Sequence, residues 1–448
     1  MHPTVEAGRV GGADESYLLA EDLFGLGAPI QFMWVFDEDP GRAAIVRLRD
    51  ELSCGRLDRR VLRTRVPFAR DRWVRAGVVP GVDFGRAAVP DADIGEWLDE
   101  RLRESALRPA DGHGWKLDAV ATDSGKYVVS LLVSHMLSDG QGLYAALAQA
   151  HAQVSTSNLP TAVQASGRKG LRADLSDAGG QVRAAGRSLA VIARELWRNR
   201  HDAQGKSKEK RSPAGTDARG GPDPTLATVD VDKQQWLDCA AEHGGTSNSL
   251  FTALLAGLVQ RSGYRTPGSQ MKICIAVNRR GDDDDRANAS GGVWIRLSGE
   301  MNPRRGLAEI RALSKQAFAD YANSGSAQVS DNMQAVVRLL PKRLVGKLMQ
   351  SIPGPDTTVS NLGVVPSTAL ELGGVTASSF AIRAIMTGRP PEHRRTLGPA
   401  VAAWAVDYGD TITITFFGIH PDHFGDNELL REQLGEELTG WGLTYRFW

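Results

Sequence analysis

Three residues suited to proton transfer stand close together in the first third of the chain. The segment from Ser134 to Gly140 reads SHMLSDG and contains an HxxxDG pattern formed by His135, Asp139 and Gly140. An imidazole held in one orientation can take a proton from a substrate hydroxyl or amine near neutral pH. Gly140 permits a backbone turn or the close approach of a ligand. A structural interpretation is equally open here, with His135 ending a strand and Asp139 capping the next helix.

Two predicted strands and a helix would position this pattern. Trp115 to Ala121 and Lys126 to Ser134 are rich in β-forming residues and flank the turn residues Asp123-Ser124-Gly125, which predicts a hairpin. Gln141 to Val154 is predicted to be a helix. His135 therefore lies where a strand ends, and side chains at such positions are held rigidly and face a cleft.

The other apolar segments predict strands and helices in both halves of the chain. The further strands are expected at Pro29 to Phe36, Thr228 to Val231, Met271 to Val277, Gly292 to Leu297, Val401 to Val406 and Thr411 to Phe417. The further helices are expected at Ala43 to Leu52, Ser188 to Trp197, Lys233 to His243, Ser249 to Gln260 and Asp426 to Leu438. Together with the hairpin, they predict an α/β (α+β) fold with mixed sheets.

A polar segment divides the chain into two nearly equal parts. Residues 201–225 are rich in Lys, Gly, Pro, Ser and Asp and lack large apolar side chains. Such a segment buries too little surface to offset the entropy lost on ordering, so we predict a flexible linker. Residues 1–200 then form an N-terminal lobe that carries the HxxxDG pattern, and residues 226–448 form a C-terminal lobe.

The helix predicted from Ser188 to Trp197 is amphipathic and basic. Arg187, Arg194 and Arg198 lie opposite its apolar face. We interpret the basic face as solvated. Docking of this face to a membrane surface or to a carrier protein is the alternative.

Composition narrows the possible partners and the compartment. The 53 basic and 53 acidic residues cancel, which argues against nucleic acid as the main partner. Cys54, Cys239 and Cys274 form neither a zinc pattern nor a disulfide framework and favour a reducing compartment. No secretory signal and no apolar run of membrane-spanning length is present. We expect a cytoplasmic monomer of bacterial composition, with peripheral membrane association as the alternative.

Two segments with metal-binding residue types are interpreted as loops. Asp282 to Asp285 is a run of carboxylates in a turn-rich stretch, whereas metal ligands usually stand at spaced positions. His420-Pro421-Asp422-His423 with Asp426 has the composition of a turn before the last helix. Nucleotide-binding glycine motifs are absent from the sequence. We therefore predict no metal and no permanently bound cofactor.

The run KYVVSLLVSHMLSDGQGLYAALAQA resembles the active-site segment of the HxxxDG acyltransferase superfamily. That superfamily includes wax ester synthase/diacylglycerol acyltransferases, polyketide-associated acyltransferases and nonribosomal peptide condensation domains. Further segments are similar to the family in the same order: Arg72-Trp73-Val74 with Val82-Asp83-Phe84, Ala110 to Val120, GGTSNSLFTALLAGLVQRSG, Val277-Asn278-Arg279-Arg280, Asn288 with Gly291-Gly292, and Val359-Ser360-Asn361-Leu362-Gly363. The resemblance covers most of the chain outside the predicted linker.

The resemblance implies two chloramphenicol-acetyltransferase-like lobes that form a pseudo-dimer with a tunnel between them. His135 would be the general base that takes the proton of an attacking hydroxyl or amine. Asp139 would support the site from behind, in the same loop as Gly140 and paired with Arg280 of a VxxR motif. The adjacent Arg279 leaves the register of that pair open by one residue.

The resemblance also implies the class of substrates. The donor would be acyl-CoA or an acyl group on the phosphopantetheine of a carrier protein, and the acceptor a small-molecule alcohol or amine. We therefore expect an acyltransferase of lipid or secondary-metabolite biosynthesis. The reaction needs a donor to the oxyanion, and Ser360 and Asn361 are candidates for contact with the oxyanion or substrate. Their alternative role is that of turn residues before Gly363.

The chain departs from the family pattern at several positions. Ser134 stands where many members carry a first histidine, Ser249 follows Asn248 where an aspartate is usual, and Gly114 directly precedes Trp115. Two alternatives therefore remain. One is a free-standing condensation enzyme that forms an ester or amide from a carrier-bound aminoacyl group. The other is a catalytically silent member that binds a carrier protein or lipid.

Overall fold

The computed structural model describes residues 8–198, 224–266, 269–281, 284–324, 336–351, 354–396 and 398–448. Residues 201–223 of the predicted linker lie outside the described residues, as do Asp282 and Asp283 of the carboxylate run.

The first half of the chain contains α1 (Gly12–Phe24), β1 (Pro29–Phe36), α2 (Arg42–Cys54), β2 (Arg60–Leu62), β3 (Arg72–Val74), β4 (Val82–Phe84), η1 (Asp91–Asp93), α3 (Ile94–Arg103), η2 (Pro109–Asp111), β5 (Trp115–Ala121), β6 (Tyr127–Ser134), α4 (Gly140–His151), α5 (Ala162–Ala165) and α6 (Gly167–Arg198). The second half contains β7 (Thr225–Asp232), α7 (Lys233–Glu242), α8 (Ser247–Arg261), β8 (Met271–Asn278), β9 (Ser290–Leu297), η5 (Pro303–Arg305), α9 (Ala308–Ser324), α11 (Lys342–Ser351), β10 (Thr357–Val364), α12 (Ser367–Leu370), β11 (Glu371–Leu372), β12 (Val375–Thr376), β13 (Ser379–Ala384), α13 (Pro391–Thr396), β14 (Val401–Tyr408), β15 (Thr411–Gly418), α14 (Pro421–Phe424), α15 (Asn427–Gly440) and β16 (Tyr445–Phe447).

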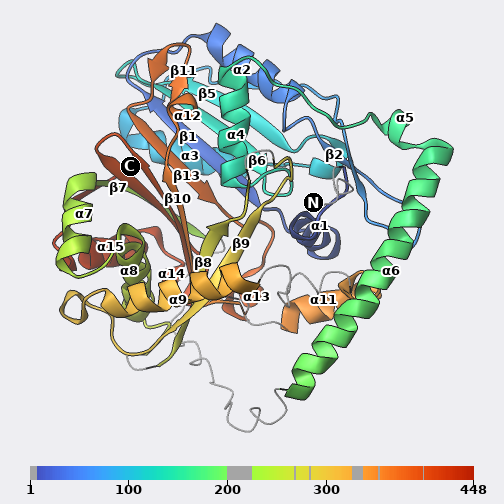
Figure 1. The fold of residues 1–448 in the computed structure, drawn as a ribbon. Coiled ribbons are helices and arrows are strands. Elements are labelled where there is room, and N and C mark those ends of the chain that lie inside the picture. The colour runs from blue at the N-terminus through green and yellow to red at the C-terminus, as the bar shows by residue number, and fades with distance from the viewer. Residues whose placement is uncertain are drawn as a thin grey trace.

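Two large mixed sheets organise the molecule (Figure 1). The first has the order β13-β1-β6-β5-β4, and the second has the order β16-β7-β15-β14-β10-β8-β9. In the first sheet β4 runs parallel to β5, and in the second β10 runs parallel to both β8 and β14. The other neighbouring strands of these sheets are antiparallel. The predicted fold class with mixed sheets is confirmed.

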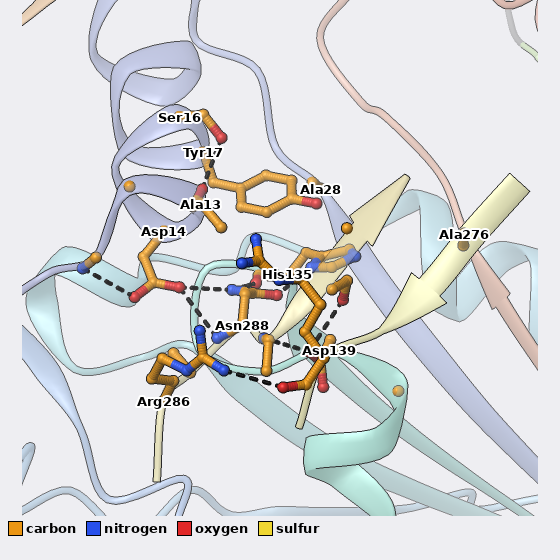
Figure 2. Close-up of a pocket in the computed structure, with 18 of the residues that line it drawn as sticks. Ala13, Asp14, Ser16, Tyr17, Ala28, His135, Asp139, Ala276, Arg286 and Asn288 are labelled. Carbon is orange, nitrogen blue, oxygen red and sulfur yellow. Dashed lines mark hydrogen bonds between the residues drawn. The ribbon is translucent and has the colours of Figure 1, made fainter. Parts of the chain in front are cut away.

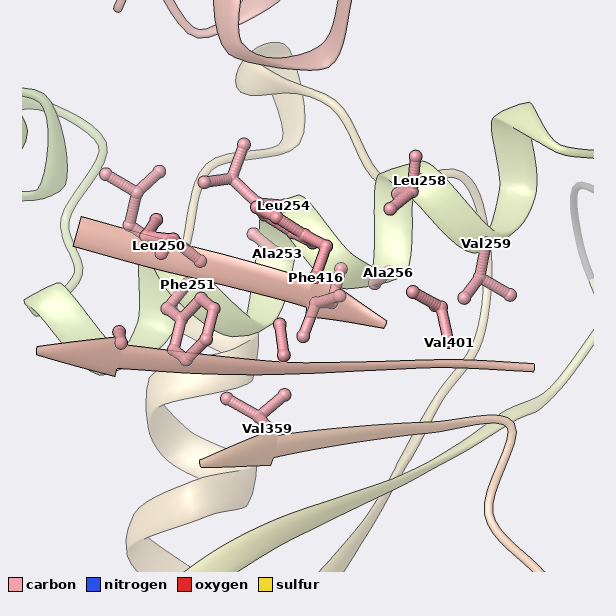
Figure 3. Packing of buried hydrophobic residues seen from close by; sticks show 14 of the residues in the cluster. Leu250, Phe251, Ala253, Leu254, Ala256, Leu258, Val259, Val359, Val401 and Phe416 are labelled. Atoms are coloured by element: carbon pink, nitrogen blue, oxygen red, sulfur yellow. The ribbon is translucent and has the colours of Figure 1, made fainter. Parts of the chain in front are cut away.

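Helix α8 forms the buried centre of the second half. Thr246 caps the helix, because its side chain accepts a hydrogen bond from the Ser249 amide at 3.2 Å. The helix packs its apolar side chains on the strands of the seven-stranded sheet, where Val359, Val401 and Phe416 lie (Figure 3). Burial of a large apolar side chain stabilises the fold by about 1.5–3 kcal/mol, so α8 is a major contributor to the second core.

A strand from the second half completes the sheet of the first half. β13 pairs antiparallel with β1 in a register that runs from Ile30↔Ala384 to Val35↔Ser379. Phe380 is fully buried there, and its ring centroid lies 5.7 Å from that of Phe32 and 5.4 Å from that of Trp34. The predicted lobe boundary therefore does not separate the two sheets. A short apolar strand carries no local signal for its pairing partner, and the partner here is far away in the sequence.

The predicted helix from Ser188 to Trp197 is the last part of the longer α6, which runs along one side of the molecule (Figure 1). Asp174 of α6 binds Arg9 at 2.7 Å and Arg72 at 2.6 Å, which fastens the helix to the first lobe. Within the described part of the chain, no helix combines the length and the apolar composition needed to cross a membrane.

We expect fragments 1–212 and 213–448 to assemble when produced together, because β13 of the second fragment pairs with β1 of the first. Phe380→Ala should weaken assembly by about 3–5 kcal/mol, the range for truncation of a buried phenylalanine. Phe318→Ala is the matched control, since α9 packs on β9 and α8 of the same fragment. Gel filtration and calorimetry of the mixed fragments measure both effects. Separate elution, or equal affinities of the two variants, would contradict the shared sheet.

Candidate active site

Residues of both halves line one cavity of about 2500 Å³. His135, Asp139 and Gly140 of the first half line it, as does Ser360 of the second half. Arg280 and Asn361, the other two site residues expected from the sequence, are not among its lining residues. Asn288 also lines the cavity, and its side chain contacts His135.

The backbone on both sides of His135 is held by neighbouring segments. The His135 amide donates to the Ala28 carbonyl at 2.7 Å, and the Ser134 amide donates to the Gly114 carbonyl at 2.8 Å. Ser134 is buried, and its hydroxyl oxygen accepts a hydrogen bond from the Met136 amide at 3.3 Å. The histidine thus leaves the end of β6 on a fixed backbone.

Asn288 orients the imidazole of His135 (Figure 2). The Asn288 Nδ2 donates to the His135 carbonyl at 2.7 Å and to Asp14 Oδ1 at 2.9 Å, and both partners are acceptors. The amide oxygen Oδ1 must therefore face His135 Nδ1, which lies 2.8 Å away. An amide oxygen can only accept, so Nδ1 carries the proton and Nε2 is the basic nitrogen of the neutral ring.

Helix α1 supplies two residues of this site. Asp14 is buried and accepts from the Asn288 amide at 3.1 Å and from the Gly11 amide at 3.2 Å. Tyr17 stacks on the imidazole of His135, with ring centroids 4.5 Å apart and an interplanar angle of 21° (Figure 2). The phenol ring thus covers one face of the imidazole.

Asp14 and Tyr17 were not predicted as site residues from the sequence, and Asn288 was noted only for its place beside Gly291-Gly292. The segment from Gly12 to Phe24 was not predicted as a helix. Its two buried residues, Asp14 and Leu18, stand four positions apart, which is the spacing of neighbours on one face of a helix. No local pattern connects this helix to the HxxxDG loop, because the contact joins distant parts of the chain.

Burial lowers the pKa of His135 below its ordinary value of 6.5. The nearby charge of Asp139 and the hydrogen bond to Asn288 act in the opposite direction and do not overcome the effect of burial. His135 is therefore neutral at physiological pH, the state that a general base requires.

Asp139 combines a helix cap with an ion pair. Its Oδ1 accepts from the Gly142 amide at 2.7 Å, at the N-terminus of α4, and from Arg280 Nη2 at 2.9 Å. Its Oδ2 accepts from the Ala289 amide at 2.6 Å and from the Ser290 hydroxyl at 3.0 Å. Burial acts to raise the pKa of Asp139, but Arg280 and the amide donors lower it below its ordinary value.

The partner of Asp139 is Arg280, and its neighbour Arg279 lies near the ring of Tyr321. Arg280 Nη1 also donates to the Asp284 and Arg286 carbonyls, each at 2.8 Å. One guanidinium therefore joins the HxxxDG loop to the connection between β8 and β9.

Gly140 meets a close neighbour from the second half. A Cβ atom at this position would collide with Leu362 Cδ2 of β10, so the first turn of α4 is packed tightly against that strand. The Gln141 side chain donates to the Leu362 carbonyl at 3.0 Å in the same place. Close packing against Leu362 therefore explains the glycine at position 140, whereas the sequence suggested a backbone turn or a nearby ligand.

The two candidates for the oxyanion contact lie in different surroundings. Ser360 faces the cavity from β10. Asn361 is exposed, and its side chain accepts from the Gly363 amide at 2.8 Å and donates to Asn248 Oδ1 at 3.1 Å.

The other carboxylate and histidine segments have protein partners. Asp284 binds Arg286, Asp285 binds Arg56, and Asp422 binds Arg395. Among the residues that the structure describes, no three histidine, cysteine, aspartate or glutamate side chains are grouped so that they could hold a metal ion.

No family model and no curated protein matches the chain. Among solved structures, it is similar to the wax ester synthase/diacylglycerol acyltransferase from Marinobacter aquaeolei VT8, at 14% identity and a TM-score of 0.57, with 97% of this chain and 100% of that chain covered. It is similar to the first condensation domain of the calcium-dependent antibiotic synthetase, at 15% identity and a TM-score of 0.60, covering 98% and 96%.

A third similar structure is a mutant starter condensation domain of rhizomide synthetase in complex with C8-CoA, at 15% identity and a TM-score of 0.54, covering 97% and 95%. At this identity the likenesses concern the fold. Over the matched 97–98% of its length the chain has the fold shared by these acyltransferase and condensation-domain structures, and the fold that the sequence resemblance implied is confirmed.

If His135 acts as a general base, the pH dependence of the reaction should report its lowered pKa. Only the neutral imidazole can take a proton, so kcat/KM should fall as the pH drops through the pKa of His135. Because burial lowers that pKa, the midpoint of the acid limb should lie below 6.5. A pH series of initial rates measures it, and a midpoint above 6.5 would contradict a neutral, desolvated imidazole.

Asp139→Ala should destabilise the protein by about 3–5 kcal/mol, because it leaves the buried Arg280 guanidinium without its carboxylate. The pKa of Asp139 is lowered in the folded state, so its contribution is present at neutral pH and is lost as the pH falls below 3.8. Asp285→Ala, which removes a largely exposed partner of Arg56, is the control. Urea unfolding measures both, and equal midpoints for the two variants would refute a supporting role of Asp139.

Proposed function

We propose that the protein is an acyltransferase that moves an acyl group from a thioester to a hydroxyl or amine, with His135 as the general base. One observation carries the proposal: a neutral imidazole, protonated at Nδ1 and held by Asn288, lines a large cavity built by both halves. The fold shared with acyltransferase and condensation-domain structures supports the same class of reaction.

The proposed reaction steps follow from the tautomer of His135, in which Nδ1 carries the proton and Nε2 is free to accept one. As the acceptor oxygen or nitrogen attacks the thioester carbonyl, Nε2 of His135 takes the proton that the acceptor loses. A tetrahedral oxyanion forms and then collapses, the carbon–sulfur bond breaks, and the thiolate leaves. The imidazolium returns its proton to the thiolate, so the products are an ester or amide and a free thiol.

Asn288 and Asp139 are positioning residues in this proposal. The Asn288 amide oxygen accepts a hydrogen bond from Nδ1–H of His135, and Asp14 in turn accepts one from the Asn288 amide nitrogen. Asp139, with Arg280, braces the loop that carries His135. A rigid surrounding of this kind keeps the base within reach of the substrate proton throughout the reaction.

Ser360 is our candidate for the contact with the oxyanion. Its hydroxyl can donate a hydrogen bond, and it lines the same cavity as His135. Asn361 is a weaker candidate, because its side chain is engaged with Gly363 and Asn248.

The donor in this proposal is acyl-CoA or an acyl-phosphopantetheine, and no permanently bound cofactor takes part. A starter condensation domain of the same fold is known in complex with C8-CoA, which supports a thioester of this kind. A free-standing condensation enzyme that uses a carrier-bound aminoacyl group is the second candidate, supported by the likeness to condensation domains over the full chain.

His135→Ala should lower the rate of thiol release by about 10²- to 10⁴-fold, the contribution of a general base. The assay supplies an acyl-CoA with a panel of alcohols and amines and follows the free thiol and the acylated product. The control is His151→Ala, which removes an exposed histidine at the end of α4. Unchanged turnover in His135→Ala would exclude this mechanism. Thiol release only from carrier-bound aminoacyl donors would favour the condensation enzyme.

A further inference from the structure

β8 and β9 form part of the cavity wall, and their antiparallel register orders the side chains along it. Directly opposed residues of such a pair project from the same face of the sheet. On one face the successive pairs are Asn278↔Ser290, Ala276↔Gly292, Cys274↔Trp294 and Lys272↔Arg296. Ser290 and the two middle pairs line the cavity, and Lys272 and Arg296 continue the same face beyond the lining residues. On the other face Ile273 and Ile295 pack in the core with α8.

One end of this row adjoins the HxxxDG loop. Ser290 donates to Asp139 Oδ2 at 3.0 Å, and Arg280, just after Asn278, binds the other oxygen of the same carboxylate. At a rise of about 3.3 Å per residue, the Lys272 end of β8 lies roughly 20 Å along the strand from Asn278. The row therefore leads from the catalytic loop to a distant part of the sheet.

Two cations face each other at the far end. Lys272 and Arg296 are directly opposite on β8 and β9, an arrangement in which like charges destabilise a sheet. Burial lowers the pKa of Lys272, and the charge of Arg296 lowers it further. Within the described ranges neither side chain forms an ion pair. An anion bound between them would relieve the repulsion.

An exposed aromatic ring stands beside the cations. Trp294 lines the cavity, and it is 48% exposed although tryptophan is usually well buried. The Lys272 ammonium lies 4.1 Å from the centre of its ring. An exposed indole next to paired cations suits a ligand that carries both phosphate and a planar heterocycle.

We propose that Lys272, Arg296 and Trp294 bind the nucleotide end of a coenzyme A donor. The cations would hold its phosphates, and the indole would stack on its adenine. The extended pantetheine arm would then lie along Ala276 and Gly292 and carry the thioester toward His135. This inference rests on the proposed acyl transfer, and it selects coenzyme A over a carrier protein as the donor.

A carrier-bound phosphopantetheine shares part of this chemistry. It brings one phosphate to the cation pair but has no adenine for Trp294. Only coenzyme A uses all three side chains, and the exposed indole is the reason for preferring it. The two sources differ in their dependence on Trp294, which makes them separable by experiment.

The first test measures binding of coenzyme A itself by calorimetry, without any reaction. Lys272→Gln combined with Arg296→Gln should weaken binding by roughly tenfold or more, as expected for lost charged hydrogen bonds to phosphate. Arg311→Gln combined with Lys315→Gln removes the same charge from the exposed face of α9 and should leave the affinity unchanged. Equal affinities of the two double variants would overturn the proposal.

The second test compares three donors with the same acyl group: acyl-CoA, acyl-phosphopantetheine and acyl-N-acetylcysteamine. Trp294→Ala should raise KM for acyl-CoA by roughly five- to a hundredfold, the range for loss of one base–aromatic stack. It should leave KM for the other two donors unchanged, and Trp294→Phe should restore most of the affinity for acyl-CoA. If wild-type protein uses acyl-phosphopantetheine as well as acyl-CoA, the role assigned to Trp294 is wrong.

The two proposals fail in distinguishable ways. If the protein binds coenzyme A through the cation pair but releases no thiol, the binding site stands and acyl transfer fails. The converse outcome is His135-dependent acyl transfer from acyl-N-acetylcysteamine while the Lys272→Gln and Arg296→Gln substitutions leave the affinity for coenzyme A unchanged. In that case acyl transfer stands and the binding site fails.

Discussion

The buried ion pair between Asp139 and Arg280 joins the two halves of the chain at the site. Asp139 belongs to the loop that carries His135, and Arg280 belongs to the connection that leads to Asn288. Each oxygen of the carboxylate accepts two hydrogen bonds, one from the backbone and one from a side chain. A carboxylate so fully satisfied remains charged although it is buried, and the contact has little freedom to shift. The position of His135 relative to the cavity wall depends on this contact.

The state of His135 follows from that arrangement. With the connection from β8 to β9 held by Arg280, the Asn288 amide oxygen reaches the imidazole and accepts a hydrogen bond from its Nδ1–H. Burial keeps the ring neutral, and Tyr17 covers one of its faces. The same environment that would be unfavourable for an imidazolium thus keeps Nε2 available as a base. A histidine at the surface would share the residue type but neither the orientation nor the lowered pKa.

The register of β8 and β9 makes the two ends of this strand pair chemically different. Ser290 connects one end of the strand pair to Asp139, while Lys272 and Arg296 stand at the other end. A strand pair that begins at the HxxxDG loop and ends in two cations fits the proposed long donor, whose reacting and anionic groups are far apart. Both features come from one strand pair, so the distance between them is set by the backbone and does not depend on flexible side chains.

Local patterns in the sequence were sufficient for the elements that carry the HxxxDG loop. The strand from Pro29 to Phe36, the hairpin before His135 and the helix predicted from Gln141 to Val154 all depend on neighbouring residues, and the structure has them within a few residues of the predicted bounds. The pairing of β13 with β1, the choice of Arg280 over Arg279, and the contacts of Asp14 and Tyr17 were decided by the tertiary structure. Each of these joins segments that are distant in the chain, and the periodicity of one segment does not encode which remote segment will pack against it.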